Sequence, residues 1–256
     1  MAKILILGGT AEARALAERL APRRDLDVTL SLAGRTAAPA RQAVPVRVGG
    51  FGGADGLTDY LKRERVDILI DATHPYASVI SANAAAAARA ANICLIALQR
   101  PAWAPVAGDR WTEVTDVAAA VEALGKTVRR VFVTLGRNEL APLQSAPQHF
   151  YLIRSVDPVE PPLAVPHAHY VTARGPFAAA DERTLMTAHG IDIVIAKNSG
   201  GTATYGKIEA ARALGIAVII LRRPPAPDRP AACNVDEALV LLDHALASAA
   251  ATARGV

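Results

Sequence analysis

The fold is decided by the stretch "KILILGGTAEARALAERL", which runs from Lys3 to Leu20. The apolar run Ile4 to Leu7 is too short for a helix, and it lacks the alternation of a strand with one face in water. Such a run is typical of a central strand in a parallel sheet, because helices cover both faces of that sheet. Gly8 and Gly9 then end the strand in a tight turn.

A helix is expected to follow this turn and to begin near Ala11. Thr10 is placed to cap the helix, and Glu12 lies in its first turn, where a negative charge is favourable. A strand, a glycine turn and a helix N-terminus form the order that a dinucleotide phosphate site requires. The usual Gly-x-Gly-x-x-Gly pattern is incomplete, however, because Thr10 and Ala13 occupy its second and third glycine positions. By itself the stretch therefore fits a phosphate turn and an ordinary strand-turn-helix equally well.

Composition indicates a globular protein with a small anionic ligand. The chain has 256 residues, enough for one large domain or two small ones, and 52% of them are hydrophobic. The alanine-rich region 81–98 contains Asn83, Arg89 and Asn92, which argues against a membrane span. Only a short apolar run precedes Gly8, so no secretory signal is expected. The net charge of +4 is not gathered in a lysine-rich run or an aromatic stripe, which favours small acidic substrates over nucleic acid.

The cysteines and histidines give no sign of a metal or redox site. Cys94 and Cys233 do not have a metal-ligand or redox spacing, and Cys94 falls in an apolar strand, where it is interpreted as a small core residue. Asp71 and His74 lack a third ligand nearby, and the "HAH" at residues 167–169 stands apart from other metal-type residues. We therefore expect no metal and a reducing, cytoplasmic location.

Two stretches of the chain repeat one pattern of strand, loop, helix and strand. Residues 66–101 end in "ICLIALQRP", and residues 191–224 end in "IAVIILRRP". The matching pairs are Asp67 with Asp192, Arg89 with Arg212, and Pro101 with Pro224. The segment "VFVTLGRNEL" at residues 131–140 also resembles "ILILGGTAEA" at residues 4–13. Because the matched residues are not alanines, an alanine-rich composition does not explain the repeat, and two similarly wound lobes are expected.

The expected fold is α/β, with two similar Rossmann-like lobes that have parallel sheets and a cleft between them. Residues 1–101 are expected to form the cofactor-binding lobe, and residues 102–256 a second lobe that binds substrate. The boundary is placed in "RPAWAPVAGDRW", Arg100 to Trp111, where proline and glycine interrupt the periodicity. Ligands of parallel sheets bind beyond the carboxyl ends of the strands, so four post-strand loops are candidates. They are residues 8–12, 71–77, 136–139 and 197–207.

The residues after the second expected strand favour NADP over NAD. The segment "SLAGRT" contains no acid to bind the ribose of NAD, whereas Ser31 and Arg35 are suited to the 2′-phosphate of NADP. The next turn, "VGGFGG" at residues 48–53, offers flexible backbone at Gly50 and an aromatic ring at Phe51 near the expected adenine. The plain alternative is a solvated arginine after a strand.

The loop "DATHPYA" at residues 71–77 contains the candidate proton donor. His74 precedes a proline, which favours an extended or turn conformation, so its side chain can project into the cleft. Three roles remain open for His74: a proton donor, a hydrogen-bond donor to the substrate, or a residue that only shapes the turn.

The loop "KNSGGTATYGK" at residues 197–207 combines cations, hydroxyl groups and glycines between a strand and a helix. Such a loop can direct backbone N–H groups at an anion. It lacks the Gly-x-x-x-x-Gly-Lys-Ser/Thr arrangement, which disfavours nucleoside triphosphate hydrolysis, and carboxylate binding remains open. The alternative is that Lys197 ends a strand in solvent and that Gly200 and Gly201 merely turn the chain.

Nine segments in one order carry a family resemblance. They are "ILILGGTAEARALA", "DATHPYASVISANA", "RPAW", "VFVTLGRNEL", "SVDP", "GPF", "LM", "KNSGGTATYGKIEAAR" and "RRP". Between Ile4 and Pro224 the chain thus resembles the precorrin-6A reductase family of cobalamin biosynthesis. The resemblance implies a monomeric enzyme that transfers a hydride from NADPH to precorrin-6A, a metal-free tetrapyrrole, to give precorrin-6B. Three alternatives stay open: reduction of the cobalt-containing macrocycle, NADP-dependent reduction of another small acidic metabolite, and a nucleotide-sensing module without catalysis.

With this resemblance, the candidate site residues form three groups. The catalytic candidates are His74, Tyr76 and Lys197. The cofactor-binding candidates are Gly8, Gly9, Thr10, Glu12, Ser31, Arg35, Gly50, Phe51, Ala72 and Thr73. The substrate-binding candidates are Arg137, Asn198, Ser199, Gly200, Gly201, Thr202, Tyr205 and Lys207, and Arg154 and Arg174 are further cations for the acetate and propionate arms. The expected partner is the tetrapyrrole, with transfer of intermediates to neighbouring pathway enzymes and no contact with nucleic acid or membrane.

Overall fold

The computed structural model describes residues 1–34, 41–224 and 230–254, with side chains as far as Ala249. The chain divides into two compact units. The first unit joins Met1–Pro101 to Pro224–Val256, and the second unit is Ala102–Arg223. No helix in the described part of the chain is both long and apolar enough to cross a membrane.

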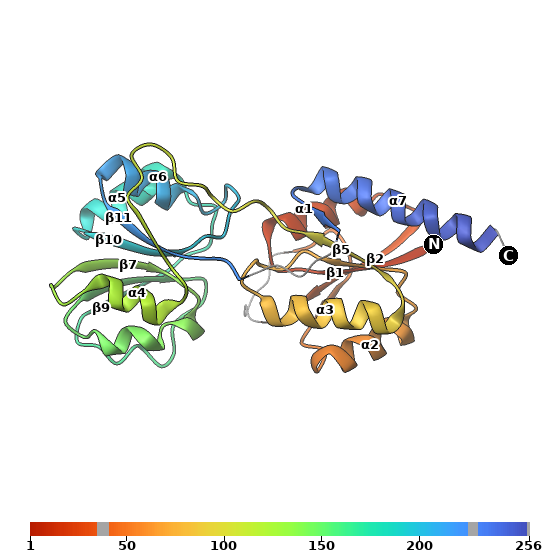
Figure 1. The fold of residues 1–256 in the computed structure, drawn as a ribbon, viewed down its shortest axis with the longest axis horizontal. Coiled ribbons are helices and arrows are strands. Elements are labelled where there is room, and N and C mark those ends of the chain that lie inside the picture. Colours follow the sequence, from red (N-terminus) through yellow and green to blue (C-terminus); the bar gives the residue numbers. More distant parts are fainter. Residues whose placement is uncertain (35–40, 225–229, 255–256) are drawn as a thin grey trace. The chain divides into compact units, whose positions relative to one another are not determined.

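The first unit is a parallel six-stranded sheet with helices on both faces (Figure 1). Its strand order is β12-β5-β4-β1-β2-β3. The strands are β1 (Ala2–Leu7), β2 (Leu26–Leu32), β3 (Val46–Val48), β4 (Ile68–Asp71), β5 (Cys94–Leu98) and β12 (Ala231–Ala232). The helices are α1 (Ala11–Leu20), α2 (Gly53–Glu64), α3 (Ser78–Ala91) and α7 (Val235–Arg254).

Strand β1 confirms the prediction of a central strand. It lies between β2 and β4, and its side chains alternate between two buried cores. Ile4 and Ile6 pack with residues of α1 and α7, whereas Leu5 and Leu7 pack with residues of α2 and α3. The run is uniformly apolar because helices cover both faces of the sheet.

The second unit repeats this architecture. Its parallel sheet has the order β6-β11-β10-β7-β8-β9. The strands are β6 (Trp111–Val114), β7 (Arg130–Thr134), β8 (Phe150–Ser155), β9 (Ala168–Thr172), β10 (Ile193–Lys197) and β11 (Ala217–Leu221). The helices are α4 (Val117–Leu124), α5 (Ala179–Ala188) and α6 (Gly206–Leu214), and the 3-10 turns are η1 (Arg137–Glu139) and η2 (Ala141–Ser145). Two Rossmann-like parallel sheets confirm the predicted fold class.

The chain crosses between the units twice and exchanges their edge strands. After β5 it enters the second unit, where β6 pairs with β11; after β11 it returns, and β12 pairs with β5. The assignment of all residues from 102 to 256 to the second lobe therefore needs correction, because residues from Pro224 onward belong to the first unit. Ala238 and Leu242 of α7 are fully buried in the core of the first unit, and this burial holds the returning segment there.

One matched pair of the repeat makes the same hydrogen bonds in both units. The Asp67 carboxylate accepts the backbone N–H of Lys3 at 2.7 Å, and the Asp192 carboxylate accepts the backbone N–H of Arg130 at 2.8 Å. The backbone N–H of each aspartate donates in turn to the carbonyl of the same partner, at 2.9 Å in both cases. Asp67 therefore ties the start of β4 to β1, and Asp192 ties the start of β10 to β7.

Cys94 is exposed, so its interpretation as a core residue was wrong. It is the first residue of β5, and the short edge strand β12 pairs only with Ala97 and Leu98 at the other end of β5. The amino end of β5 is therefore left uncovered by β12.

Candidate functional site

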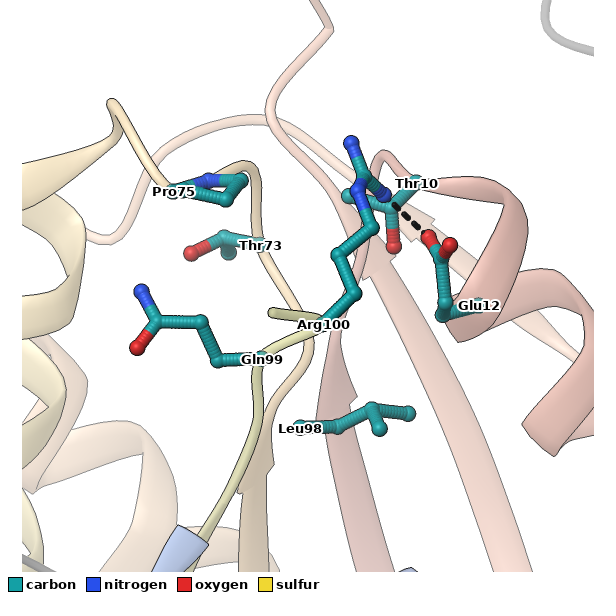
Figure 2. A pocket seen from close by; sticks show the side chains of 7 residues that line it. All are labelled: Thr10, Glu12, Thr73, Pro75, Leu98, Gln99 and Arg100. Atoms are coloured by element: carbon teal, nitrogen blue, oxygen red, sulfur yellow. Dashed lines mark hydrogen bonds and ion pairs between the residues drawn. The ribbon is translucent and has the colours of Figure 1, made fainter. Parts of the chain in front are cut away.

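A small pocket lies at the carboxyl edge of the first sheet, where the strand order reverses between β1 and β4. It is lined by Thr10, Glu12, Thr73, Pro75, Leu98, Gln99 and Arg100, as Figure 2 shows. These residues follow or end β1, β4 and β5. The crevice at such a reversal is where doubly wound sheets bind their ligands.

Thr10 ties the turn after β1 to the end of β4. Its hydroxyl oxygen accepts the backbone N–H of Ala13 at 3.1 Å, which caps α1 as predicted, and the hydroxyl donates to the carbonyl of Ala72 at 2.8 Å. Gly9 has a φ of 118°, and a Cβ at this position would meet no atom within 4 Å. A side chain at Gly9 would therefore have room, but the positive φ is a backbone conformation that favours glycine.

Glu12 and Arg100 form an ion pair over this turn (Figure 2). Their side chains are 23% and 14% exposed, respectively. The guanidinium of Arg100 therefore lies beside the N-terminus of α1, with the Glu12 carboxylate as one of its counter-ions. The helix dipole favours an anion at this N-terminus, and Arg100 adds to that attraction to the extent that Glu12 does not neutralise it.

Three other predicted cofactor residues are gathered around an arginine that the sequence analysis missed. Arg47 donates to the carbonyl oxygens of Gly49 and Gly50 at 2.5 and 2.7 Å and lies 3.4 Å from the Ser31 hydroxyl. Its guanidinium also stacks 3.8 Å from the ring centre of Phe51. A usable signal was present in the sequence, since Arg47 directly precedes "VGGFGG". The predicted contact Arg35 lies outside the described residues.

The loop after β4 is held by its own polar side chains. The buried carboxylate of Asp71 accepts the backbone N–H and the hydroxyl of Thr73, at 3.1 and 2.6 Å. Nδ1 of His74 accepts the backbone N–H of Tyr76 at 3.3 Å, and the two rings lie 5.6 Å apart between centres. Because Nδ1 is an acceptor in this bond, a neutral His74 carries its proton on Nε2.

In the second unit a carboxylate occupies the turn that corresponds to the first unit's phosphate turn. Glu139 accepts the backbone N–H of Gly136 at 3.0 Å and forms an ion pair with Lys197 at the end of β10. The turn leads into the short 3-10 segment η1 instead of a capped α-helix. Arg137 within this segment is exposed.

The first part of the 197–207 loop is hydrogen-bonded to Trp103 and Arg223, which lie near the two ends of the segment that forms the second unit. The side-chain amide of Asn198 accepts the Trp103 N–H at 2.7 Å and donates to the Trp103 carbonyl at 2.9 Å. Arg223 donates to the carbonyls of Asn198 and Ser199, both at 2.7 Å. The indole N–H of Trp103 reaches the Gly201 carbonyl at 2.8 Å. This network fixes the backbone of the loop within the second unit.

The rest of this loop carries groups of differing exposure. Gly200 and Gly201 have φ values of 66° and 70°, and Thr202 is exposed. The Tyr205 hydroxyl accepts a hydrogen bond from Arg212 at 2.5 Å. Lys207 is buried, and its ammonium donates to the Thr204 carbonyl at 2.6 Å. Lys207 is therefore positioned to hold the loop as well as to add positive charge.

Arg154, which was expected to be a cation for the carboxylate arms of the substrate, is paired inside the protein. It forms a buried two-pronged ion pair with Glu182, with Nη2 at 3.0 Å from Oε2, and its guanidinium stacks 3.6 Å from the ring centre of Phe177. The two side chains are 6% and 3% exposed. Arg174, by contrast, is exposed. Within residues 1–34, 41–224 and 230–249, no group of three histidine, cysteine or carboxylate side chains has a geometry that could hold a metal ion.

Comparison with known proteins identifies the family. The model of the family described as precorrin-6x reductase CbiJ/CobK matches residues 3–243. The chain belongs to this family. The precorrin-6A reductase of a Sinorhizobium species is 55% identical over 247 residues, which cover 96% of this chain and 95% of that protein. The precorrin-6A reductase of Rhodobacter capsulatus is 47% identical over the full length of both chains.

A solved structure of a family member has the same fold. The structure described as CobK precorrin-6A reductase superposes with a TM-score of 0.92 at 46% identity, and the match covers 96% of this chain and 97% of that one. The predicted family resemblance is thereby confirmed, and this member is an oxidoreductase of cobalamin biosynthesis.

Proposed function

We propose that this chain uses NADPH to reduce precorrin-6A to precorrin-6B. The observation that supports this most strongly is the full-length similarity to precorrin-6A reductases, combined with an open glycine turn at the N-terminus of α1. NADPH, when bound, would supply the hydride for the macrocycle. The protein would then align the nicotinamide with the acceptor carbon of the macrocycle and supply a proton to the carbon next to it.

The first unit is proposed to bind the cofactor. Gly8, Gly9 and Thr10 present the backbone of the turn, and Arg100 adds a cation beside it. The second unit lacks this arrangement because the Glu139 carboxylate already occupies the Gly136 N–H. We therefore assign the pyrophosphate to the turn after β1, and the ribose and adenine to the ends of β2 and β3.

Gly9→Val is expected to weaken NADPH binding by more than 100-fold. A side chain at Gly9 would enter the open space in front of the helix N-terminus and displace the phosphate from its N–H donors. Two charge-assisted hydrogen bonds of about 1.5 kcal/mol each account for this loss. Calorimetric titration measures it. Gly125→Val, which strains a glycine with a φ of 72° in the second unit, is the control and should leave NADPH affinity unchanged. A folded Gly9→Val variant with wild-type affinity contradicts the assignment.

The second unit is proposed to bind the carboxylate arms of the substrate. Lys197 ends β10, Arg137 lies in the turn after β7, and Gly200 and Gly201 follow Lys197 in the loop. The ion pair between Glu139 and Lys197 indicates that a carboxylate can be bound beside this ammonium. A substrate arm that binds Lys197 would compete with Glu139 for this ammonium.

Opposite changes in the Michaelis constant for substrate are expected from Lys197→Ala and Glu139→Gln. Lys197→Ala should raise it about 10-fold and make it less sensitive to salt, since a charge-assisted contact is lost. Glu139→Gln should lower it, because the competing carboxylate is removed. Steady-state kinetics at two salt concentrations measure both effects, with the exposed Lys126→Ala as the control. Loss of NADPH binding in Lys197→Ala, with substrate binding intact, would reverse the assignment of the two units.

The choice of substrate is tested by direct comparison. Purified protein is mixed with NADPH and either precorrin-6A or its cobalt complex, and the absorbance of NADPH is followed. Faster consumption with the metal-free macrocycle supports the proposal, and faster consumption with the cobalt complex favours the related activity. Consumption with neither would point to another small acidic metabolite.

A further inference from the structure

Arg47 differs from the other partly buried arginines of the first unit in its partners. Arg23 and Arg100 each pair with carboxylates. Within residues 1–34, 41–224 and 230–249, no acidic side chain forms an ion pair with Arg47; its contacts are carbonyl oxygens, a hydroxyl and aromatic rings. These neutral groups orient the guanidinium without cancelling its charge. A partly buried cation of this kind favours an anionic ligand.

The contacts of Arg47 also hold it in one position. Two carbonyl oxygens of the turn after β3 accept from its Nη atoms, and its plane is covered by Phe51 and, at 5.2 Å, by Tyr60. Phe51 and Tyr60 pack edge to face, 5.1 Å between ring centres. Because two elements contribute to this stack, little side-chain entropy remains to be lost when Arg47 binds a ligand.

Arg47 lies where a Rossmann-like unit contacts the adenosine ribose of a dinucleotide. Arg47 lies in β3, and the Ser31 hydroxyl beside it is at the end of β2, next to the phosphate turn. The Gly8 N–H donates to the Ser31 carbonyl at 2.9 Å, which joins the two places directly. A Cβ at Gly49, Gly50 or Gly52 would meet no atom within 4 Å, so the turn after β3 is open to a ligand.

We infer that Arg47, with Ser31, binds the 2′-phosphate of the cofactor and sets the preference for NADPH over NADH. This inference rests on the proposed NADPH dependence. The phosphate would add a charge-assisted partner to the guanidinium, whereas NADH has only a hydroxyl at that place.

Calorimetric titration with NADP+ and NAD+ tests the inference. Wild type should bind NADP+ more tightly than NAD+. Arg47→Met, which keeps much of the packing on Phe51, should weaken NADP+ binding by about 10- to 150-fold and leave NAD+ binding within a factor of about two. Arg47→Gln keeps neutral N–H donors for the two carbonyls and should show the same selective loss, so the test does not depend on the folding of one variant. Arg63→Met is the matched control, since Arg63 stacks on Tyr60 at 5.4 Å but is exposed and pairs with Glu64.

The outcomes separate the inference from the proposed function. If wild type prefers NADP+ and the Arg47 variants keep that preference, the inference is wrong and the proposed function stands. If wild type binds neither dinucleotide, or both equally, the proposed NADPH dependence and the inference fail together. Equal losses for NADP+ and NAD+ would show that Arg47 only supports the turn, which also overturns the inference.

Discussion

Replacing His74 with asparagine is expected to lower turnover by about 10²- to 10⁴-fold, the usual contribution of a positioned acid or base. The structure gives His74 a defined tautomer, because Nδ1 accepts the Tyr76 N–H at 3.3 Å and the proton of the neutral ring is therefore on Nε2. A group that delivers a proton to the macrocycle needs such an orientation. Asparagine can keep the hydrogen bond to Tyr76 through its side-chain oxygen, but it cannot supply the proton.

Single-turnover kinetics and thermal melting together measure this effect. The melting temperature of His74→Asn should stay close to that of wild type, and NADPH affinity should be unchanged. His74→Ala, which loses the hydrogen bond as well, shows how much the loop conformation contributes. A His74→Asn variant that reduces substrate at the wild-type rate would exclude His74 as the proton donor, and one that unfolds would show that its role is structural.

Glu182→Ala is expected to lower the free energy of unfolding by about 3–5 kcal/mol, because it leaves the Arg154 charge buried without its partner. Arg154 is 6% exposed and lies against the Phe177 ring, so water cannot replace the lost carboxylate. Denaturant unfolding monitored by circular dichroism measures the loss.

Two further variants identify the cause of that loss. The double variant Arg154→Met with Glu182→Leu removes both charges and should recover most of the stability, since a buried ion pair is often replaceable by apolar residues of similar volume. Glu113→Ala breaks the exposed pair with Arg222 and should have little effect. If Glu182→Ala leaves stability intact and instead changes the Michaelis constant for substrate, Arg154 is a substrate contact after all.

The parts of the fold that depend on local pattern could be predicted from the sequence. The uniform apolar run before Gly8 indicated a strand covered on both faces, and the matched residues Asp67 and Asp192 indicated the repeat. The exchange of edge strands could not be predicted, because β12 is two alanines long and carries no pattern. The return of the chain at Pro224 depends on the burial of α7 residues against strands far away in sequence.

The loops that form the candidate site could be predicted from the sequence, but the contacts between side chains of different loops could not. Thr10 was expected to cap α1 and does so. The pairing of Lys197 with Glu139 joins residues distant in sequence, and only the folded sheet brings their two loops together. The position of Arg47 just before the turn "VGGFGG" was visible in the sequence, but its contact with Ser31 depends on the alignment of β2 with β3.

The central claim is that this protein moves a hydride from NADPH to precorrin-6A, and isotope transfer tests it most directly. NADPH that carries deuterium at both C4 positions of the nicotinamide is mixed with the protein and precorrin-6A, and the product is analysed by mass spectrometry. The account predicts precorrin-6B that contains one deuterium from the cofactor. With unlabelled NADPH in deuterated water, the carbon that receives the hydride should carry hydrogen, and the solvent deuterium should enter at the adjacent carbon that takes the proton. Formation of precorrin-6B without deuterium from NADPH, or no reduction of precorrin-6A by folded protein that binds NADPH, would contradict it.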